Sequence, residues 1–147
     1  MKKLFLYVIA VLVLMQLYRP AKNSSTAVSE NSIQKVIQVP EPIQKILSRS
    51  CNDCHSNNTR YLWYHEIAPL SYVVAYHISE GKEHVNFDAW GKYNANQKKH
   101  IIDNLEEVIE SREMPLVGYL KFHPDAVISD ADNQKLLDWI KTLESKE

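Results

Sequence analysis

The sequence predicts an all-α domain with long loops, preceded by an N-terminal hydrophobic segment. Apolar residues recur at helical spacing in several stretches, and strand-like alternation is not sustained anywhere. Only three glycines occur in 147 residues, which is few for the turns of an all-β fold. The hydrophobic content of 45% and the charged content of 24% are ordinary for one globular domain. The formal net charge of −1 gives no basic field, so we expect no nucleic-acid partner.

The N-terminus has the pattern of an export segment. Lys2 and Lys3 precede an apolar run over residues 4–18 that only Gln16 interrupts. As a helix this run spans about 22 Å, short of a hydrocarbon core of about 30 Å. Residues 1–19 are therefore either a cleaved signal peptide or a transmembrane anchor. The residues after the run are not small, which favours the anchor and places the domain on the periplasmic side of the inner membrane.

Four further helices are predicted behind a linker. Residues 20–39 are rich in serine and asparagine and suggest a flexible linker, with the domain at 40–147. Proline suits the first turn of a helix that starts near residue 40 and runs into Cys51. The apolar spacing predicts further helices over residues 70–80, over 96–111 and from 129 onwards. Gly81 is expected to end the helix over residues 70–80 as a C-terminal cap. Asn94 or Asn96 is expected to begin the helix over residues 96–111.

The chemistry is expected at Cys51-Asn52-Asp53-Cys54-His55. Two thiols at this spacing can each add to one vinyl group of a haem, and the following histidine can then ligate the iron. This is the pattern of covalent c-type haem attachment, and it predicts one haem c in a small cytochrome c-like helical domain.

Two other chemistries use cysteine pairs. A structural zinc site needs four ligands, whereas Cys51, Cys54 and His55 supply three, and the adjacent Cys54 and His55 would have difficulty meeting one tetrahedral ion. A thioredoxin-like dithiol needs a βαβ pattern, which is not visible. We therefore favour haem over both.

Met114 is the expected distal ligand of the iron. It is the only methionine outside the N-terminal segment, and it precedes Pro115, which disfavours helical geometry and moves it onto a loop. His77, on an apolar helix face, is the alternative ligand, and His123 is a weaker candidate. His65, His84 and His100 lie among polar residues and are expected to be solvated. Trp63 and Tyr64, the aromatic residues expected to contact the haem, follow the motif.

The sequence resembles a known family, the small bacterial haem-binding domain of c-type cytochromes. The resemblance covers roughly residues 40–142 and implies one covalent haem in a helical domain, with Met114 compatible as distal ligand. Leu62 and Tyr72 stand where the family often has proline and tryptophan, and these departures affect loop detail. The matching residues are Cys51–Asn57, Trp63, Tyr64, Ile67–Pro69, His77, Gly81, Asn86, Phe87, Trp90, Glu113–Pro115, Tyr119, His123, Pro124 and Trp139.

An iron held by histidine and thioether has no open coordination position, which favours single-electron transfer over catalysis. We expect redox partner proteins at the membrane. The alternative is a haem-based enzyme or gas sensor, for example a peroxidase-like protein, which needs an open or displaceable distal position. A purely structural haem domain is a third possibility.

Overall fold

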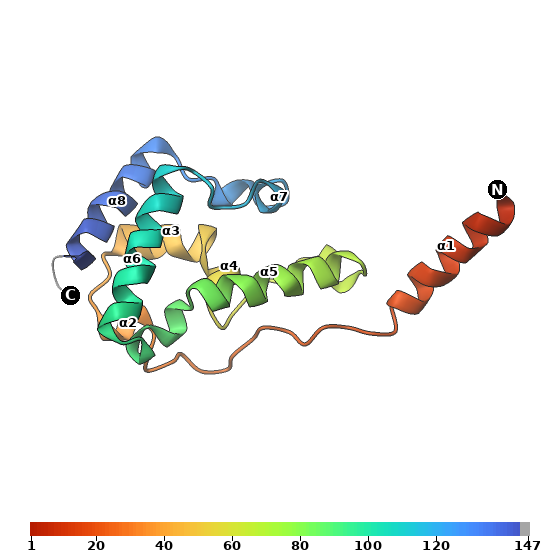
Figure 1. Cartoon of the computed structure of the whole chain (residues 1–147), viewed down its shortest axis with the longest axis horizontal. Coiled ribbons are helices and arrows are strands. Elements are labelled where there is room, and N and C mark those ends of the chain that lie inside the picture. Colours follow the sequence, from red (N-terminus) through yellow and green to blue (C-terminus); the bar gives the residue numbers. More distant parts are fainter. Residues whose placement is uncertain (145–147) are drawn as a thin grey trace.

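Helices account for the regular structure of the described chain, residues 1–144, in the computed structural model (Figure 1). No strand occurs in this range, in agreement with the predicted all-α class. The longer helices are α1 (Lys2–Met15), α3 (Glu41–Ser50), α5 (Leu70–His84), α6 (Ala95–Glu110) and α8 (Asp130–Glu144). Short helices α2 (Ile33–Val36), α4 (Asn52–His55) and α7 (Val117–Leu120) and the 3-10 helices η1 (Trp63–Glu66), η2 (Phe87–Lys92) and η3 (Pro124–Ala126) lie between them.

Helices α6 and α8 pack against each other and form one end of the domain (Figure 1). Each begins as the sequence predicts. Asn94 accepts a hydrogen bond from Gln97 N at 3.0 Å in a reciprocal capping box, and Ser129 Oγ accepts from Asp132 N at 3.1 Å. Their buried faces join α3 in one core. The buried members of this core are Ile33, Val39, Ile43, Ile46, Leu47, Val85, Phe87, Trp90, Ile101, Ile102, Ile109, Ile128, Leu136, Trp139, Ile140 and Leu143.

The second half of the expected linker is folded. Ile33, at the start of α2, is 2% exposed, and Val39 is also buried in the core. Helix α2 packs against η2, where Gly91 N donates to Asn31 O at 2.9 Å. Burial of these two aliphatic side chains removes apolar surface from water and stabilises this stretch against the domain, despite its serine-rich composition.

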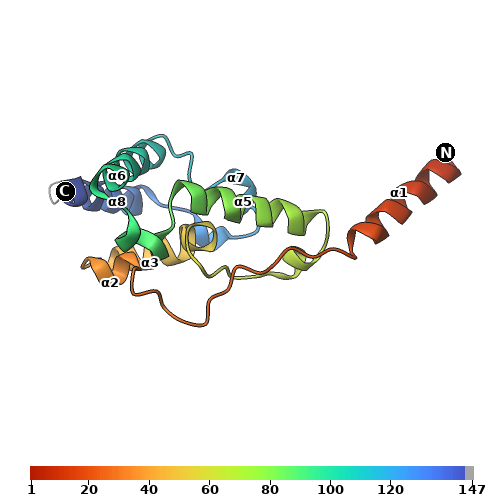
Figure 2. The same ribbon diagram turned by 60° about the horizontal axis from the view of Figure 1, so that its bottom comes forward.

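Helix α1 is present where the sequence predicts a hydrophobic helix, and it projects away from the rest of the molecule (Figures 1 and 2). Its transmembrane role is not supported, because none of the helices in residues 1–144 is both long enough and apolar enough to cross a bilayer. Helix α1 has 14 residues, which corresponds to about 21 Å.

Gly81 does not end α5, as the sequence suggested, but lies inside it. The helix continues to His84. A Cβ at position 81 would lie 2.8 Å from the backbone oxygen of Cys54 and 3.1 Å from its Cβ. Glycine is required here because α5 and α4 approach backbone to backbone, which a side chain would prevent.

We predict that Gly81→Ala lowers the free energy of unfolding by about 1–3 kcal/mol, because overpacking at the α4–α5 contact outweighs the better helix propensity of alanine. Gly118→Ala is the matched control, since nothing lies within 4 Å of a Cβ there. It is expected to be neutral or stabilising by up to about 1 kcal/mol. Urea unfolding of both variants measures the difference, and equal behaviour of the two would contradict the close-approach explanation.

Candidate functional site

Cys51, Cys54 and His55 lie on one turn of helix at the junction of α3 and α4. Cys51 ends α3 by donating its N–H to Leu47 O, and the N–H groups of Cys54 and His55 turn back to Cys51 O at 3.2 and 3.0 Å. Residues three and four apart on a helical turn share a face, so both thiols and the imidazole belong to one side of this turn. Both cysteines are free thiols and partly buried.

A backbone carbonyl fixes the ring of His55. Nδ1 lies 3.0 Å from Val85 O, and because a carbonyl can only accept, Nδ1 carries the proton. The other nitrogen, Nε2, therefore holds a free lone pair in the neutral ring. Burial lowers the pKa of His55, and nearby His84 lowers it further, against the opposing effect of the Val85 and Gly81 carbonyls. The imidazole is thus neutral near pH 7, which is the form that ligates metals.

The environment of the two thiols does not suit a redox dithiol. Burial, together with the neighbouring Cys54, raises the pKa of Cys51 to about 12. Burial and the Asp53 carboxylate raise the pKa of Cys54 to about 11. Reactive dithiols instead depend on a lowered thiol pKa. Within residues 1–144 no group of three or more His, Cys, Asp or Glu side chains is placed to hold a metal ion.

Asp53, between the two cysteines, joins the motif to distant parts of the chain. Its carboxylate is buried and accepts hydrogen bonds from Tyr119 Oη at 2.7 Å and from Arg60 N at 2.8 Å. The Arg60 guanidinium also contacts this carboxylate at 3.2 Å, and it donates to Asp125 Oδ2 and Arg49 O. Burial, with the hydrogen bond to Asp53, raises the pKa of Tyr119 well above its usual range. Asp53 therefore faces the protein interior and fixes the helical turn that carries the thiols.

The aromatic residues after the motif have different surroundings. Tyr64 is buried and packs on Phe122, with ring centroids 4.6 Å apart, and on His65 at 4.1 Å. Burial raises the pKa of Tyr64, with further contributions from Asp53 and Cys54, so Tyr64 lies near the motif. Trp63, by contrast, is 73% exposed and touches Tyr64 edge-on.

Two histidines are buried beside Tyr64. His65 was expected to be solvated, but it is buried: Leu62 N donates to its Nδ1 at 2.9 Å, and its ring contacts those of Tyr61 and Tyr64. His123 stacks on Tyr119 at 3.9 Å and donates from Nδ1 to Tyr119 O. Its Nε2 is buried and has no hydrogen-bond partner among residues 1–144. Besides these local contacts, the two rings lie near each other, with centroids 6.3 Å apart, and this contact between distant segments could not be predicted from the sequence.

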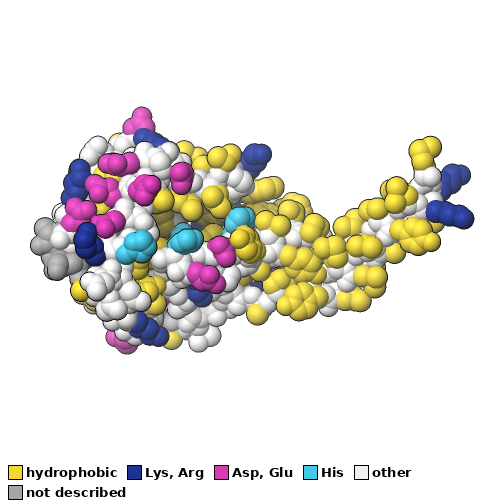
Figure 3. Space-filling view, in the orientation of Figure 1, with side chains coloured by type: hydrophobic (Ala, Val, Ile, Leu, Met, Phe, Trp, Pro, Cys, Tyr) yellow, Lys and Arg dark blue, Asp and Glu magenta, His cyan; other side chains and the backbone are white. Residues whose placement is uncertain are grey.

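Met114 lies on the loop between α6 and α7, as the Met-Pro step predicts, and is partly buried. His77, the alternative ligand, is on α5 and also partly buried, with its ring beside Tyr76. Figure 3 shows hydrophobic side chains open to the surface between the α6–α7 part of the molecule and α5. Exposed apolar residues of these elements include Val73, Leu116 and Val117. Uncovered apolar surface of this kind is what a large flat cofactor would cover.

Comparison with known proteins decides the family. The family described as haem-binding domain matches residues 10–142. The chain belongs to this family. No curated protein and no solved structure matches it. As a member of the haem-binding domain family, the protein binds haem.

The residues of this haem-binding domain fit a haem. The free Nε2 of His55 is the donor that haem iron takes from a proximal histidine. The protonated, unpaired thiols of Cys51 and Cys54 stand on the same turn. The match of the family model thus confirms the predicted resemblance to the haem-binding domain family.

The Asp53 contact gives a prediction for this haem-binding domain. Tyr119→Phe removes the hydroxyl that donates to a buried carboxylate, and is expected to lower the free energy of unfolding by about 1–3 kcal/mol. Tyr76→Phe is the control, because Tyr76 is exposed and its hydroxyl has no hydrogen bond in the described structure. It is expected to change stability by less than about 0.5 kcal/mol. A loss of stability as large for Tyr76→Phe as for Tyr119→Phe in urea unfolding would contradict the assigned role.

Proposed function

We propose that this haem-binding domain carries one haem c, joined to Cys51 and Cys54 by thioether bonds, and passes single electrons between redox partners. The observation that carries the proposal is the Nδ1 hydrogen bond of His55 to Val85 O, 3.0 Å long, on the turn that holds both thiols. This hydrogen bond leaves Nε2 as the one basic nitrogen of the ring. Metal-ligating histidines are oriented in the same way, by a hydrogen bond from their other ring nitrogen. The bound haem supplies an iron that alternates between the ferrous and ferric states.

Met114 is our proposed second axial ligand. Its loop between α6 and α7 adjoins the uncovered apolar surface, and its thioether is a ligand that favours ferrous iron and raises the reduction potential. His77 is the alternative, and would give two nitrogen ligands and a lower potential. Either residue would occupy the remaining ligand position of the iron, which would suit electron transfer and leave no position for a substrate.

The proposed export of the chain supports covalent attachment of the haem. Lys2, Lys3 and the apolar helix α1 form a segment of the secretory kind, and we propose that the domain works outside the cytoplasm at the membrane surface. Its partners there are proposed to be membrane-associated redox proteins. Electron-transfer encounters use small, transient interfaces, so no dedicated docking groove is needed.

Met114→Ala tests the proposal. In the purified ferric protein with haem matured, we expect a weak far-red sulfur-to-iron absorption band that is absent from the variant. His77→Ala is the matched control on the competing residue and should keep the band. A wild-type protein that lacks the band and binds carbon monoxide or cyanide at once has an open distal position. That result would contradict electron transfer as the function and support a haem-based enzyme or gas sensor.

A further inference from the structure

The described structure leaves helix α1 without a protein partner. None of its residues is buried, and every residue after Lys3 is apolar or aromatic, so the helix is apolar on all sides. A helix of this kind is normally surrounded by apolar material, either a protein core or a membrane. A groove in a partner protein would cover one side of the helix, whereas lipid covers all of them.

The chain that follows α1 is bound tightly to the body. We call residues 15–23 the strap. Gln16 exchanges two hydrogen bonds of 3.0 Å with the backbone N–H and carbonyl of Ala68, just before α5. The hydroxyl of Tyr72, in the first turn of α5, donates to the carbonyls of Met15 and Tyr18. The position of α1 is therefore tied to the N-terminal end of α5.

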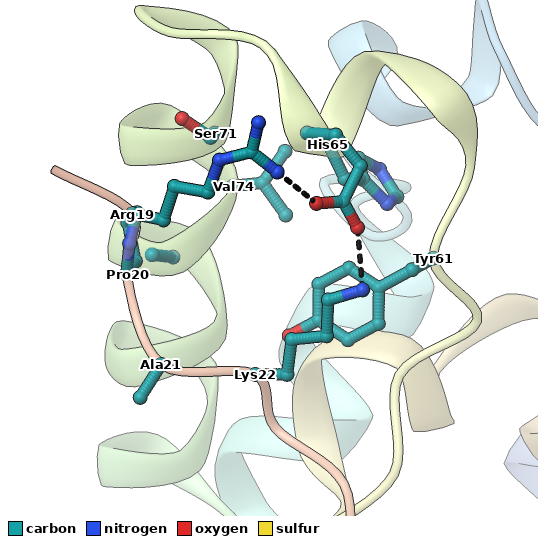
Figure 4. Close-up of a pocket in the computed structure, with 10 residues that line it drawn as sticks. Arg19, Pro20, Ala21, Lys22, Tyr61, His65, Ser71 and Val74 are labelled. Atoms are coloured by element: carbon teal, nitrogen blue, oxygen red, sulfur yellow. Dashed lines mark hydrogen bonds and ion pairs between the residues drawn. The ribbon is translucent and has the colours of Figure 1, made fainter. Parts of the chain in front are cut away.

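Charged contacts complete the strap. The side chains of Arg19 and Lys22 point towards the same carboxylate beside His65 and Tyr61 (Figure 4), and this carboxylate is that of Glu66. The two ion pairs lower the pKa of Glu66 and keep it ionised at neutral pH.

Asn23 connects the strap to the loop after the cysteine–histidine motif. Its side chain donates to Ser56 O at 2.9 Å and to Thr59 Oγ1 at 3.0 Å, and its backbone N–H donates to Tyr61 Oη at 2.7 Å. The strap thus fixes the orientation of the haem-binding turn relative to α1.

Beside the ion pairs of the strap, the part of the body next to α1 carries exposed apolar side chains. Trp63 is 73% exposed, and Ile67 and Leu70 are also exposed, beside the strap residues Leu17 and Tyr18. We call these five residues the apolar end. In the space-filling view hydrophobic side chains continue from α1 over the adjoining part of the body, whereas charged side chains gather at the far end, over α6 and α8 (Figure 3). Figures 1 and 2 both place the start of α5 at the end nearest α1.

We propose that the apolar end rests on a lipid bilayer, that α1 is embedded in one leaflet without crossing the bilayer, and that the strap holds the domain in one fixed orientation there. The proposal goes beyond electron transfer and does not depend on it. Tryptophan and tyrosine suit this position, because their rings are apolar and their polar tips reach the headgroup region. Lys2 and Lys3 can extend their charged tips to lipid headgroups. The end of the domain formed by α6 and α8, where charged side chains gather, then faces the aqueous phase.

The three tryptophans make the orientation measurable. Trp90 and Trp139 are 1% and 6% exposed, so they are internal references for a protected indole, whereas Trp63 is open to solvent. The full chain, with haem matured, is bound to vesicles of phosphatidylcholine and phosphatidylglycerol and exposed briefly to hydroxyl radicals, and oxidation is located by mass spectrometry. We expect Trp63 to be oxidised no faster than Trp90 and Trp139, while exposed His100 on α6 is oxidised freely. In lipid-free buffer Trp63 oxidation should greatly exceed that of the other two.

A variant with a weakened strap, which keeps the Tyr72 and Asn23 contacts, separates this proposal from simple tethering. Gln16→Ala with Glu66→Gln removes the Ala68 and ion-pair contacts but keeps α1, so the chain should stay on vesicles while Trp63 becomes oxidised. Glu41→Gln, which removes the exposed Lys45–Glu41 pair on α3, is the matched control and should leave Trp63 protected. Haem content and absorption, recorded on the same samples, report separately on the proposed function.

Four results would overturn the proposal. Trp63 could be oxidised on vesicles as fast as in lipid-free buffer, which would mean that the body does not rest on the bilayer. Trp63 could be protected equally without lipid, which would mean that haem or a second copy of the chain covers it. The full chain could fail to float with vesicles, or the mature protein could lack residues 1–15.

Discussion

The site depends on the close contact between α4 and α5. Gly81 lets the backbone of α5 reach the Cys54 carbonyl, where a Cβ would lie at only 2.8 Å. Four residues later, Val85 O accepts a hydrogen bond from the Nδ1–H of His55. Helix α5 and the residue that follows it thus determine two features of the site. They set the distance between α5 and the cysteine turn, and they set the tautomer of His55. A shift of α5 by an ångström would disturb both, because interiors are closely packed and do not deform smoothly.

A second set of contacts holds the turn from the opposite side. Asp53 lies between the cysteines and points away from the face they share with His55, towards Arg60 and Tyr119. Tyr119 belongs to the segment that follows Met114, the proposed distal ligand. The polar contacts of Asp53 therefore connect the motif proposed to provide the proximal ligand to the part of the chain proposed to provide the distal one. In a buried setting such bonds are valuable because an unsatisfied carboxylate would be costly.

The sequence predicts the local features of this protein well and the distant contacts poorly. The Cys51–His55 motif, the Asn94 cap and the apolar faces of α6 and α8 depend on residues close together in the chain. The Gly81 position was assigned wrongly because a helix-ending glycine and a close-approach glycine look alike in sequence. The His55–Val85 and Asp53–Tyr119 bonds join residues 30 and 66 positions apart. Pairings at that distance follow from the packed fold, which helical periodicity does not specify.

The central claim is that Cys51 and Cys54 hold a haem covalently. The intact mass of the exported protein, measured after acid-acetone extraction, tests it most directly. We predict that the wild-type chain weighs as much as its polypeptide plus one haem, and that a variant combining Cys51→Ala with Cys54→Ala weighs as much as the polypeptide alone. A wild-type chain that loses all its haem to the acid-acetone and retains only the mass of its amino acids would contradict the account.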